Sequence, residues 1–420
     1  MPKIIYFDYW TKGINNFSSI DKVLQERGFD TLLVHIGSDT EKNKEKEEVI
    51  AGITCRDIIY YNTRSLVKIF ASEKADAVII LNTERPFDRV VILSARAVGI
   101  PIVYMMHGQH YLTRSDQSTT LKKLYSKRNS LVGKFSQFRR FIRFTKDYLS
   151  AVSAYNIKDL ADKQTWMYLF GLAFDTANTI HNPKVNSQMH ADRALLYSKS
   201  YISYYANDIG YPTERIKIVG NPILDNLSNM TSAEAKPFEG PFVTYIDDGA
   251  VEAGLEGWTT ESRIDFYNRI AISCRNAGYS LLIRPHPRTD IKSLERLNSQ
   301  DYLRVRRAAL LNDDIIGSSA VIGHTSSALM LAVRLGKPVF LAKFDIGKNI
   351  FDYFYEREGA ATPCHSAEDL TNKLRAIKSG NGLETIEEFW ERFIEPADGN
   401  SAVRISEELL RVIHNPQAKS

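Results

Sequence analysis

The chain has 420 residues, of which 44% are hydrophobic and 25% are charged, and its formal net charge is +4. This length suggests two domains, and the composition is typical of a soluble globular protein. No long apolar segment opens the chain and no run of about 18 uncharged apolar residues occurs in it, so we expect neither a secretory signal nor a membrane-spanning helix.

Short apolar runs alternate with helical segments in the first half of the chain. Strands are predicted at residues 3–7, 31–35, 77–81, 102–106, 194–197 and 216–219, and helices at residues 20–27, 65–72, 87–98 and 199–207. This alternation predicts a doubly wound α/β domain with a parallel sheet, which we assign to residues 1–230. Residues 42–48 are charged, and we expect them to form a solvated stretch.

His107 directly follows the apolar run at residues 102–106 and precedes a glycine. Ligands of open parallel sheets bind beyond the carboxyl ends of the strands. Because His titrates near neutral pH, His107 is a candidate general base or acceptor-binding group. The alternative is a histidine that only caps the strand through a backbone hydrogen bond.

Residues 113–178 interrupt the alternation and are predicted to form a largely helical insertion. Its first part, residues 121–146, contains nine Lys/Arg and no acidic residue, with aromatic and aliphatic residues between them. Such a segment can lie on an anionic membrane surface, or pack on the protein with its basic face in water. Because no recognised nucleic-acid-binding module accompanies the charge, we do not expect nucleic acid as a partner.

The first domain ends at a Gly-Asn-Pro turn. Pro222 forces the preceding Asn221 into an extended conformation, and Asn221 is a candidate donor-binding residue. Residues 228–241 are rich in Ser, Ala, Lys, Glu, Gly and Pro without periodicity, so we place the domain linker there. The second domain is assigned to residues 240–400.

The first strand of the second domain, residues 242–246, is followed by Asp247, Asp248 and a glycine. Adjacent carboxylates at a strand end can supply a general base or bind hydroxyl groups. Their mutual repulsion raises the pKa of one of them, which suits proton abstraction. The alternative is an ordinary Asp-Gly turn.

A helix predicted at residues 261–276 leads to a second strand end, where Arg284, His286 and Arg288 alternate with prolines. Three cationic or cation-capable groups within five residues suit a phosphate or pyrophosphate. The alternative is a surface loop that carries these basic residues by chance.

Residues 318–341 read as a strand, a polar turn, a helix and another strand, which is a βαβ unit. The turn consists of Gly323, His324, Thr325, Ser326 and Ser327. Backbone N–H groups and hydroxyls at a helix start suit a phosphate, although serine also favours plain N-capping. We therefore predict a nucleotide or sugar-phosphate site at this turn.

The C-terminal part contains an amphipathic segment at residues 386–394, a break at Pro396 and a helix at residues 402–413. A final helix after such a break can cross back onto the first domain. We treat residues 401–420 as this helix and a tail.

Together these motifs resemble GT-B glycosyltransferases, and in particular those that build bacterial capsules and lipopolysaccharide. Bacterial sialyltransferases and polysialyltransferases carry an acidic-acidic-Gly, a His-Pro and a Ser-Ser/Thr motif, which correspond here to residues 247–249, 286–287 and 326–327. The resemblance implies an α/β fold of two Rossmann-like doubly wound domains with a crossover C-terminal helix. It also implies a base among the aspartates, a role for His286 at the donor phosphate or as acid, and binding of the CMP phosphate by the serines.

Three features depart from that pattern. In several of those enzymes the acidic motif belongs to the first domain, whereas here it opens the second. The early His-Gly and the RPHP sequence are also similar to the polyol-phosphate transferases of teichoic acid synthesis, which use CDP-glycerol and in which a histidine like His107 is the base. The apolar residues 328–331 replace the glutamate that many UDP-sugar transferases place on the ribose.

We therefore expect an inverting glycosyltransferase that moves a sugar from a nucleotide donor to a bacterial surface glycan or lipid-linked glycan. A cytidine-linked donor is favoured, such as CMP-sialic acid or a related keto-sugar. Alternatives are a CDP-polyol phosphotransferase, a UDP-sugar transferase, a nucleotide-sugar epimerase and a non-catalytic binding subunit. No metal or cofactor is expected, since Cys55, Cys274 and Cys364 are too dispersed for a metal site or a disulfide framework. We expect the protein to be located in the cytoplasm, and at the inner face of the cytoplasmic membrane if residues 121–146 bind lipid.

Overall fold

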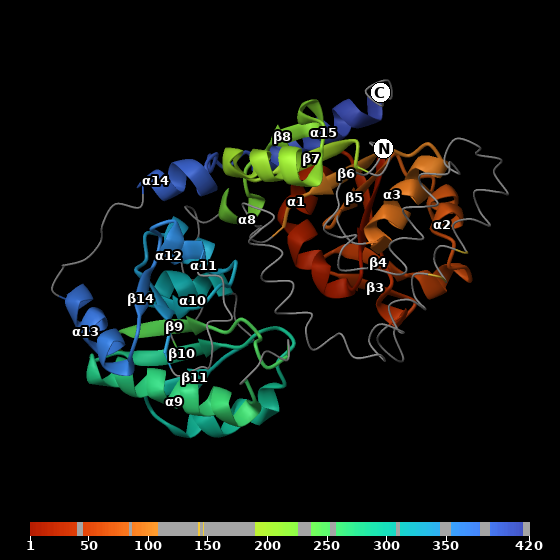
Figure 1. The fold of residues 1–420 in the computed structure, drawn as a ribbon. Coiled ribbons are helices and arrows are strands. Elements are labelled where there is room, and N and C mark those ends of the chain that lie inside the picture. Colours follow the sequence, from red (N-terminus) through yellow and green to blue (C-terminus); the bar gives the residue numbers. More distant parts are fainter. Residues whose placement is uncertain are drawn as a thin grey trace. The chain divides into compact units, whose positions relative to one another are not determined.

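The computed structural model divides into two compact units (Figure 1). It describes residues 1–39, 45–83, 86–107, 142, 146, 190–225, 237–252, 258–307, 311–344, 354–378 and 387–414. Unit 1 contains the described residues up to 225 together with those from 395 onward, and unit 2 contains the described residues between them. Apart from residues 142 and 146, the predicted insertion and its basic part at 121–146 lie outside the described residues.

Unit 1 contains a sheet with the strand order β3-β4-β2-β1-β5-β6-β7-β8. The strands are β1 (Lys3–Asp8), β2 (Asp30–His35), β3 (Glu47–Ile50), β4 (Ile53–Asp57), β5 (Ala77–Ile80), β6 (Ile102–Met105), β7 (Arg193–Leu196) and β8 (Ile216–Ile218). All neighbours pair in parallel except β3 and β4, which are antiparallel. The predicted strands are confirmed, but β3 and β4 were not predicted. The sequence of β3 is charged, and β4 alternates polar with apolar residues instead of forming an apolar run.

Helices cover both faces of this sheet, as alternation along β1 shows. Tyr6 stacks on Phe17 of helix α1 (Ile14–Glu26), with ring centroids 4.4 Å apart. The next residue, Phe7, contacts Phe70 of α2 (Leu66–Glu73) and Phe87 of α3 (Pro86–Ala97). Because successive side chains of a strand point to opposite faces, α1 covers one face and α2 and α3 the other.

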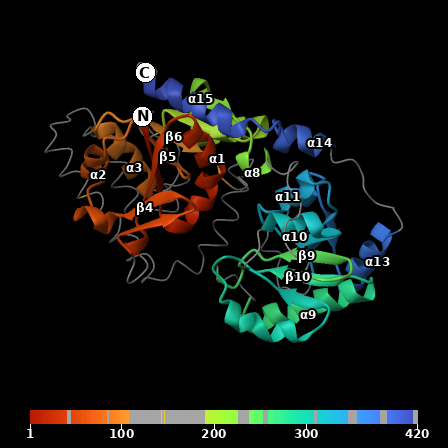
Figure 2. The ribbon, with the colours of Figure 1, turned by 180° about the vertical axis from the view of Figure 1, so that it is seen from behind.

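The C-terminal helix α15 (Ser401–His414) belongs to unit 1 and packs beside α1 (Figures 1 and 2). The carboxylate of Asp225, at the end of α8 (Pro222–Asp225), accepts hydrogen bonds from the backbone nitrogens of Gly399 (3.3 Å) and Ser401 (2.6 Å). Arg404 donates to the carbonyl oxygen of Val219 at 2.8 Å. The predicted crossover of the C-terminal helix is therefore confirmed.

Unit 2 contains a sheet with the strand order β11-β10-β9-β12-β13-β14, in which every neighbour is parallel. The strands are β9 (Phe242–Ile246), β10 (Ser280–Arg284), β11 (Leu303–Val305), β12 (Ala320–Gly323), β13 (Val339–Ala342) and β14 (Thr362–Cys364). The helices are α9 (Thr260–Asn276), α10 (Leu311–Gly317), α11 (Leu329–Arg334), α12 (Phe354–Arg357), α13 (Ala367–Lys378) and α14 (Glu387–Phe389). The predicted strands β9, β10, β12 and β13 and the predicted helices α9 and α11 are confirmed, but β11 and β14 were not predicted.

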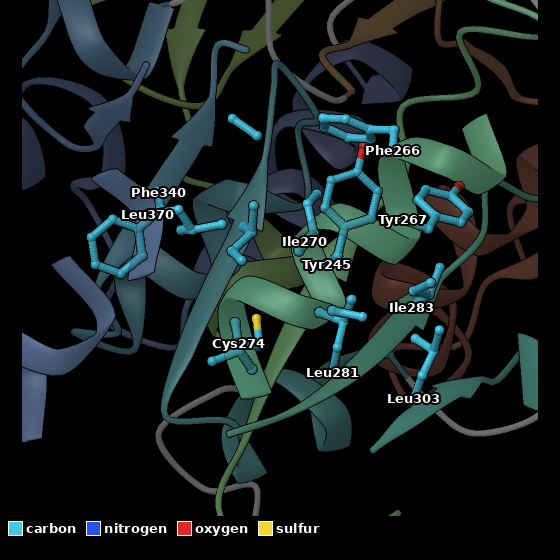
Figure 3. Close-up of a cluster of buried hydrophobic side chains, with 14 of the residues drawn as sticks. Tyr245, Phe266, Tyr267, Ile270, Cys274, Leu281, Ile283, Leu303, Phe340 and Leu370 are labelled. Carbon is cyan, nitrogen blue, oxygen red and sulfur yellow. The ribbon is translucent and has the colours of Figure 1, made fainter. Parts of the chain in front are cut away.

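The core of unit 2 lies between the sheet and α9 (Figure 3). Phe266, Ile270 and Cys274 recur along α9 at intervals of four residues, so they form one apolar face. This face packs on alternate residues of the strands, including Tyr245 of β9 and Leu281 of β10. Helix α10 lies on the other face, where Thr244 donates to the carbonyl oxygen of Asp314. No helix among the described residues is long and apolar enough to cross a membrane.

We expect Gly220→Ala to destabilise unit 1 more than Gly28→Ala. Both glycines have a positive φ, +84° and +80°, which costs a non-glycine residue about 1 kcal/mol. A Cβ at Gly220 would also lie 2.5 Å from the carbonyl oxygen of Pro396, whereas nothing lies within 4 Å of one at Gly28. Denaturant unfolding should show an additional loss of about 2 kcal/mol for Gly220→Ala. Equal losses in the two variants would contradict the docking of the C-terminal segment on this turn.

Candidate functional site

The candidate site lies where the chain order reverses in the sheet of unit 2. Strand β9 is central, the chain continues to β10 on one side, and it later returns to β12 on the other. In open α/β sheets, such a switch point forms a crevice at the carboxyl ends of the strands. The segments that follow β9, β10 and β12 carry the three sequence motifs, at residues 247–249, 284–288 and 323–327.

Alternation along β9 sends the two aspartates to different surroundings. Val243 and Tyr245 face α9, so Asp247 continues on that face. Asp248 instead meets the turn after β12, where its Oδ1 accepts hydrogen bonds from the backbone nitrogen (3.2 Å) and Oγ1 (3.3 Å) of Thr325. Its Oδ2 is buried and has no hydrogen-bond partner among the described residues.

Asp248 is a carboxyl group suited to proton exchange near neutral pH. Burial, and secondarily the charge of Asp247, raise the pKa of Asp248 to about 7, although the hydrogen bonds from Thr325 oppose this rise. A carboxylate with such a pKa can take a proton from a hydroxyl group at neutral pH.

Gly249 brings the acidic motif into contact with the His-Pro motif. A Cβ on Gly249 would lie 2.6 Å from Cγ of His286, so the imidazole rests on the glycine backbone. The φ of Gly249 is +71°, which side chains rarely tolerate. Both the space and the backbone conformation therefore require glycine at the end of the acidic motif.

The surroundings of His286 favour one tautomer of its neutral ring. Nδ1 accepts a hydrogen bond from the backbone nitrogen of Arg288 at 3.2 Å, which leaves the proton on Nε2. The carbonyl oxygen of His286 accepts from the backbone nitrogen of Thr289 (2.9 Å) and from Arg307 (3.0 Å). These bonds fix the loop so that the Nε2–H can serve as a donor to an anion.

Arg263 of α9 joins the loops after β9 and β10, and the sequence analysis did not identify it. Its Nη1 lies 2.7 Å from Oε1 of Glu252, 3.4 Å from Oγ1 of Thr289 and 3.7 Å from Oδ2 of Asp247. The side chain is 2% exposed. The signal in the sequence is its position four residues before Tyr267, on the apolar face of a predicted helix, where a charged residue needs buried partners.

Two of the predicted donor-binding side chains face elements other than the crevice, and alternation explains both. Arg284 continues the face of Leu282 and forms an ion pair with Asp314 of α10 at 2.7 Å. His324 continues the face of Ile322 and stacks on Phe266, with centroids 5.6 Å apart. Burial lowers the pKa of His324 to about 3, so this imidazole is neutral at physiological pH.

The other residues of the turn after β12 remain close to the crevice. Ser326 accepts a hydrogen bond from the backbone nitrogen of Ala328, and its carbonyl oxygen accepts from the hydroxyl of Tyr355 at 3.0 Å. Ser327 is exposed, as is the side chain of Arg288 in the neighbouring motif. Gly323 is the last residue of β12, and a Cβ there would press on Leu329 at 3.0 Å.

Two predicted residues lie in unit 1, and the structure describes them within that unit. His107 follows β6 and is half-buried at the carboxyl end of the sheet. Asn221 accepts a hydrogen bond from the backbone nitrogen of Ile223 at 3.0 Å, so its side chain caps α8. Among the residues that the structure describes, no group of three or more His, Cys, Asp or Glu side chains is placed to hold a metal ion.

No known protein family matches the sequence, and no curated protein matches it in sequence. Solved structures do match it. A UDP co-structure of MnaA from S. aureus is 12% identical, with a TM-score of 0.60, and the match covers 99% of this chain and 97% of that chain. The wall teichoic acid polymerase TagF is 14% identical, with a TM-score of 0.58, and the match covers 99% of this chain and 90% of that chain.

A third structure, a putative UDP-N-acetylglucosamine 2-epimerase from Listeria monocytogenes, is 11% identical, with a TM-score of 0.57 and coverage of 98% of this chain and 97% of that chain. At these identities the similarities establish the fold alone. The chain has the GT-B fold, an α/β architecture with two Rossmann-like units and a C-terminal helix that crosses back to the first, as predicted.

We expect Asp248→Asn to stabilise the protein above pH 7. The pKa of Asp248 is about 7 in the folded state against an ordinary value of 3.8. Between these values the folded state holds a proton that the unfolded state has released, so the unfolding free energy falls as pH rises from about 4 to 7. An amide removes this loss, which is at most about 4 kcal/mol for a shift of this size.

The measurement is the unfolding free energy of both proteins by denaturant titration across this pH interval. The difference between variant and wild type should grow in favour of the variant from about pH 4.5 to about pH 7 and stay constant at higher pH. A difference that does not change with pH would show that the pKa of Asp248 is not raised.

Proposed function

We propose that this protein is an inverting glycosyltransferase that moves a sugar from a nucleotide donor to a bacterial surface polysaccharide. The observation that carries this proposal is the contact between the three motifs at one switch point. Asp248 bonds to Thr325, and Gly249 lies against His286. A proton acceptor, a hydrogen-bond donor and a polar turn then share the crevice in which ligands of this architecture bind.

The proposed reaction assigns one role to each motif. Asp248 takes the proton of an acceptor hydroxyl, whose oxygen attacks the anomeric carbon from the face opposite the leaving group. The bond between that carbon and the phosphate oxygen breaks, and its electron pair stays on the nucleotide phosphate. The Nε2–H of His286 donates to this phosphate, and Arg288, Ser326 and Ser327 contribute further donors.

A cytidine-linked donor, such as CMP-sialic acid or a related keto-sugar, is the favoured substrate. The motif order at residues 247–249, 286–287 and 326–327 resembles that of bacterial sialyltransferases and polysialyltransferases. The apolar residues 328–331 provide no carboxylate for a ribose, which argues against a UDP donor. The acceptor is a growing glycan or a lipid-linked glycan at the inner face of the membrane, with residues 121–146 as the segment that contacts anionic lipid.

A second candidate is transfer of a polyol phosphate from a CDP donor. The similarity to TagF, which has been soaked with CDPG, supports this alternative. In that reaction His107 of unit 1 is the base. A third candidate is nucleotide-sugar epimerisation, supported by the similarity to the Listeria protein described as a putative 2-epimerase.

We expect CMP or CDP to raise the melting temperature of the purified protein. A ligand that binds only the folded state stabilises it by about 2.7 kcal/mol at a concentration of 100 times Kd. The shift should disappear in His286→Ala and persist in His365→Ala, because His365 is exposed and follows the edge strand β14, three strands away from β9. UMP, UDP and GDP serve as comparison ligands. A shift with UDP alone would contradict the cytidine preference, and no shift with any nucleotide would contradict the donor site.

Variants of Asp248 and His107 separate the three reactions. In sugar transfer, Asp248→Asn should lower the rate by about 10²–10⁴ and leave nucleotide binding intact, whereas His107→Ala should retain most of the activity. The measurement is product formation from labelled CMP-sugar, CDP-glycerol or UDP-sugar, each with and without a glycan acceptor. Turnover of the donor sugar without any acceptor would identify an epimerase. A large loss in His107→Ala with full activity in Asp248→Asn would identify the polyol-phosphate reaction.

A further inference from the structure

We propose that Arg263 is a positioning residue of this site, which holds the negative charge of the adjacent carboxylates on Asp247 and leaves Asp248 to exchange the proton. The role of that proton exchange, in which Asp248 deprotonates an acceptor hydroxyl, rests on the proposed function. The charge assignment itself rests on buried geometry in unit 2 and requires no ligand.

The two carboxylates differ in their access to a cation. Arg263 Nη1 lies 3.7 Å from Oδ2 of Asp247, and Oδ1 of Asp247 accepts from the backbone nitrogen of Gly249 at 2.9 Å. Asp248 accepts from neutral donors, among them the backbone nitrogen and hydroxyl of Thr325. A guanidinium does not lose its proton in proteins, so Arg263 is a fixed positive charge at one end of the pair.

A count of the surrounding charges supports this assignment. Arg263 faces two carboxylates, Asp247 and Glu252, and its charge lowers the pKa of Glu252 against the effect of burial. Titratable side chains near the pair among the described residues include Tyr245, Tyr267, His286 and His324. Burial raises the pKa of Tyr267 well above its ordinary value and lowers that of His324, so both are neutral. Among the described residues, Arg263 forms its ion pairs with Asp247 and Glu252, and Asp248 forms none with a Lys or Arg side chain.

Arg263 also fixes the spacing between the two motifs. Its contact with Thr289 at 3.4 Å reaches the loop that carries His286, and the backbone nitrogen of Thr289 donates to the carbonyl oxygen of His286. Its contacts with Asp247 and Glu252 reach the loop that carries Asp248. The buried side chain of Arg263 thus joins the loop that carries Asp248, the proposed proton acceptor, to the loop that carries His286, the proposed hydrogen-bond donor to the phosphate.

The test is a pH titration of protein labelled with ¹³C at the aspartate carboxyl carbons, without any nucleotide. The signals are assigned by their absence in Asp247→Asn and Asp248→Asn. In the wild type, the Asp248 signal should titrate with a midpoint near 7 while the Asp247 signal stays constant in that interval. In Asp247→Asn, the Asp248 midpoint should fall by about one pH unit or more, because the neighbouring negative charge is gone.

Substitutions of Arg263 decide whether it is responsible. In Arg263→Met, the Asp247 and Asp248 signals should move together over the same pH interval, because neither carboxyl then has a cation. Arg263→Lys keeps the charge and should restore a constant Asp247 signal. Arg275→Met is the matched control, since Arg275 is exposed near the end of the same helix and lies over the ring of Tyr302.

The combination of Arg263→Met with Glu252→Gln removes one charge of each sign and replaces the single variant if that variant does not fold. Joint movement of the two signals in the wild type, or a constant Asp247 signal after loss of Arg263, would overturn the proposal. Failure of every nucleotide to bind would instead overturn the proposed function and leave the charge assignment standing.

Discussion

The site of unit 2 depends on two adjacent carboxylates at the end of β9, of which Asp247 is buried and Asp248 is half-buried. Removing a carboxylate from water without compensation costs several kcal/mol, and two neighbouring carboxylates also repel each other. Helix α9 supplies a positive charge beside the pair, and its apolar face contributes the burial that offsets the remaining free-energy cost. Arg263 lies beside Asp247, and the same helix buries Phe266, Ile270 and Cys274 against the sheet. Asp248 is withdrawn from water and lies beside the charge of Asp247, and these two effects, in that order, raise its pKa to about 7.

The two-residue period of the strands determines where each polar side chain acts. Along β9 it directs Asp247 toward α9 and its arginine, and Asp248 toward Thr325. Along β10 and β12 it directs Arg284 toward Asp314 and His324 into the aromatic core. Residues that a sequence motif groups together are therefore divided between the strand ends, the core and the opposite face of the sheet.

The sequence analysis identified most strands because a buried parallel strand is an apolar run bounded by turn residues. It did not identify β3, whose residues are charged, or β4, whose polar and apolar residues alternate. It also did not identify β11 and β14, which have three residues each and are too short to form an apolar run. The switch-point location of Asp248, His286 and Thr325 was also predictable, since strand ends meet at one edge of a parallel sheet. Arg263, Arg307 and Tyr355 were not, because each acts through partners that lie more than ten positions away and come close only when the helices dock. The position of His324 in the core follows from the two-residue alternation of β12, which continues one residue past the end of the strand.

The fold by itself does not choose the reaction, because proteins described as a 2-epimerase and a teichoic acid polymerase share it at 11–14% identity to this chain. The choice lies in the few side chains at the strand ends. Nδ1 of His286 already accepts a hydrogen bond from the backbone nitrogen of Arg288, so in the neutral ring Nε2 is the donor. In unit 2, Asp248 has the buried oxygen and the pKa for the role of base. A hydrogen-bond donor can stabilise the negative charge of a leaving phosphate. At the same pH, a carboxylate whose pKa is near 7 can deprotonate a hydroxyl group. That pairing supports the proposed transfer to an acceptor hydroxyl.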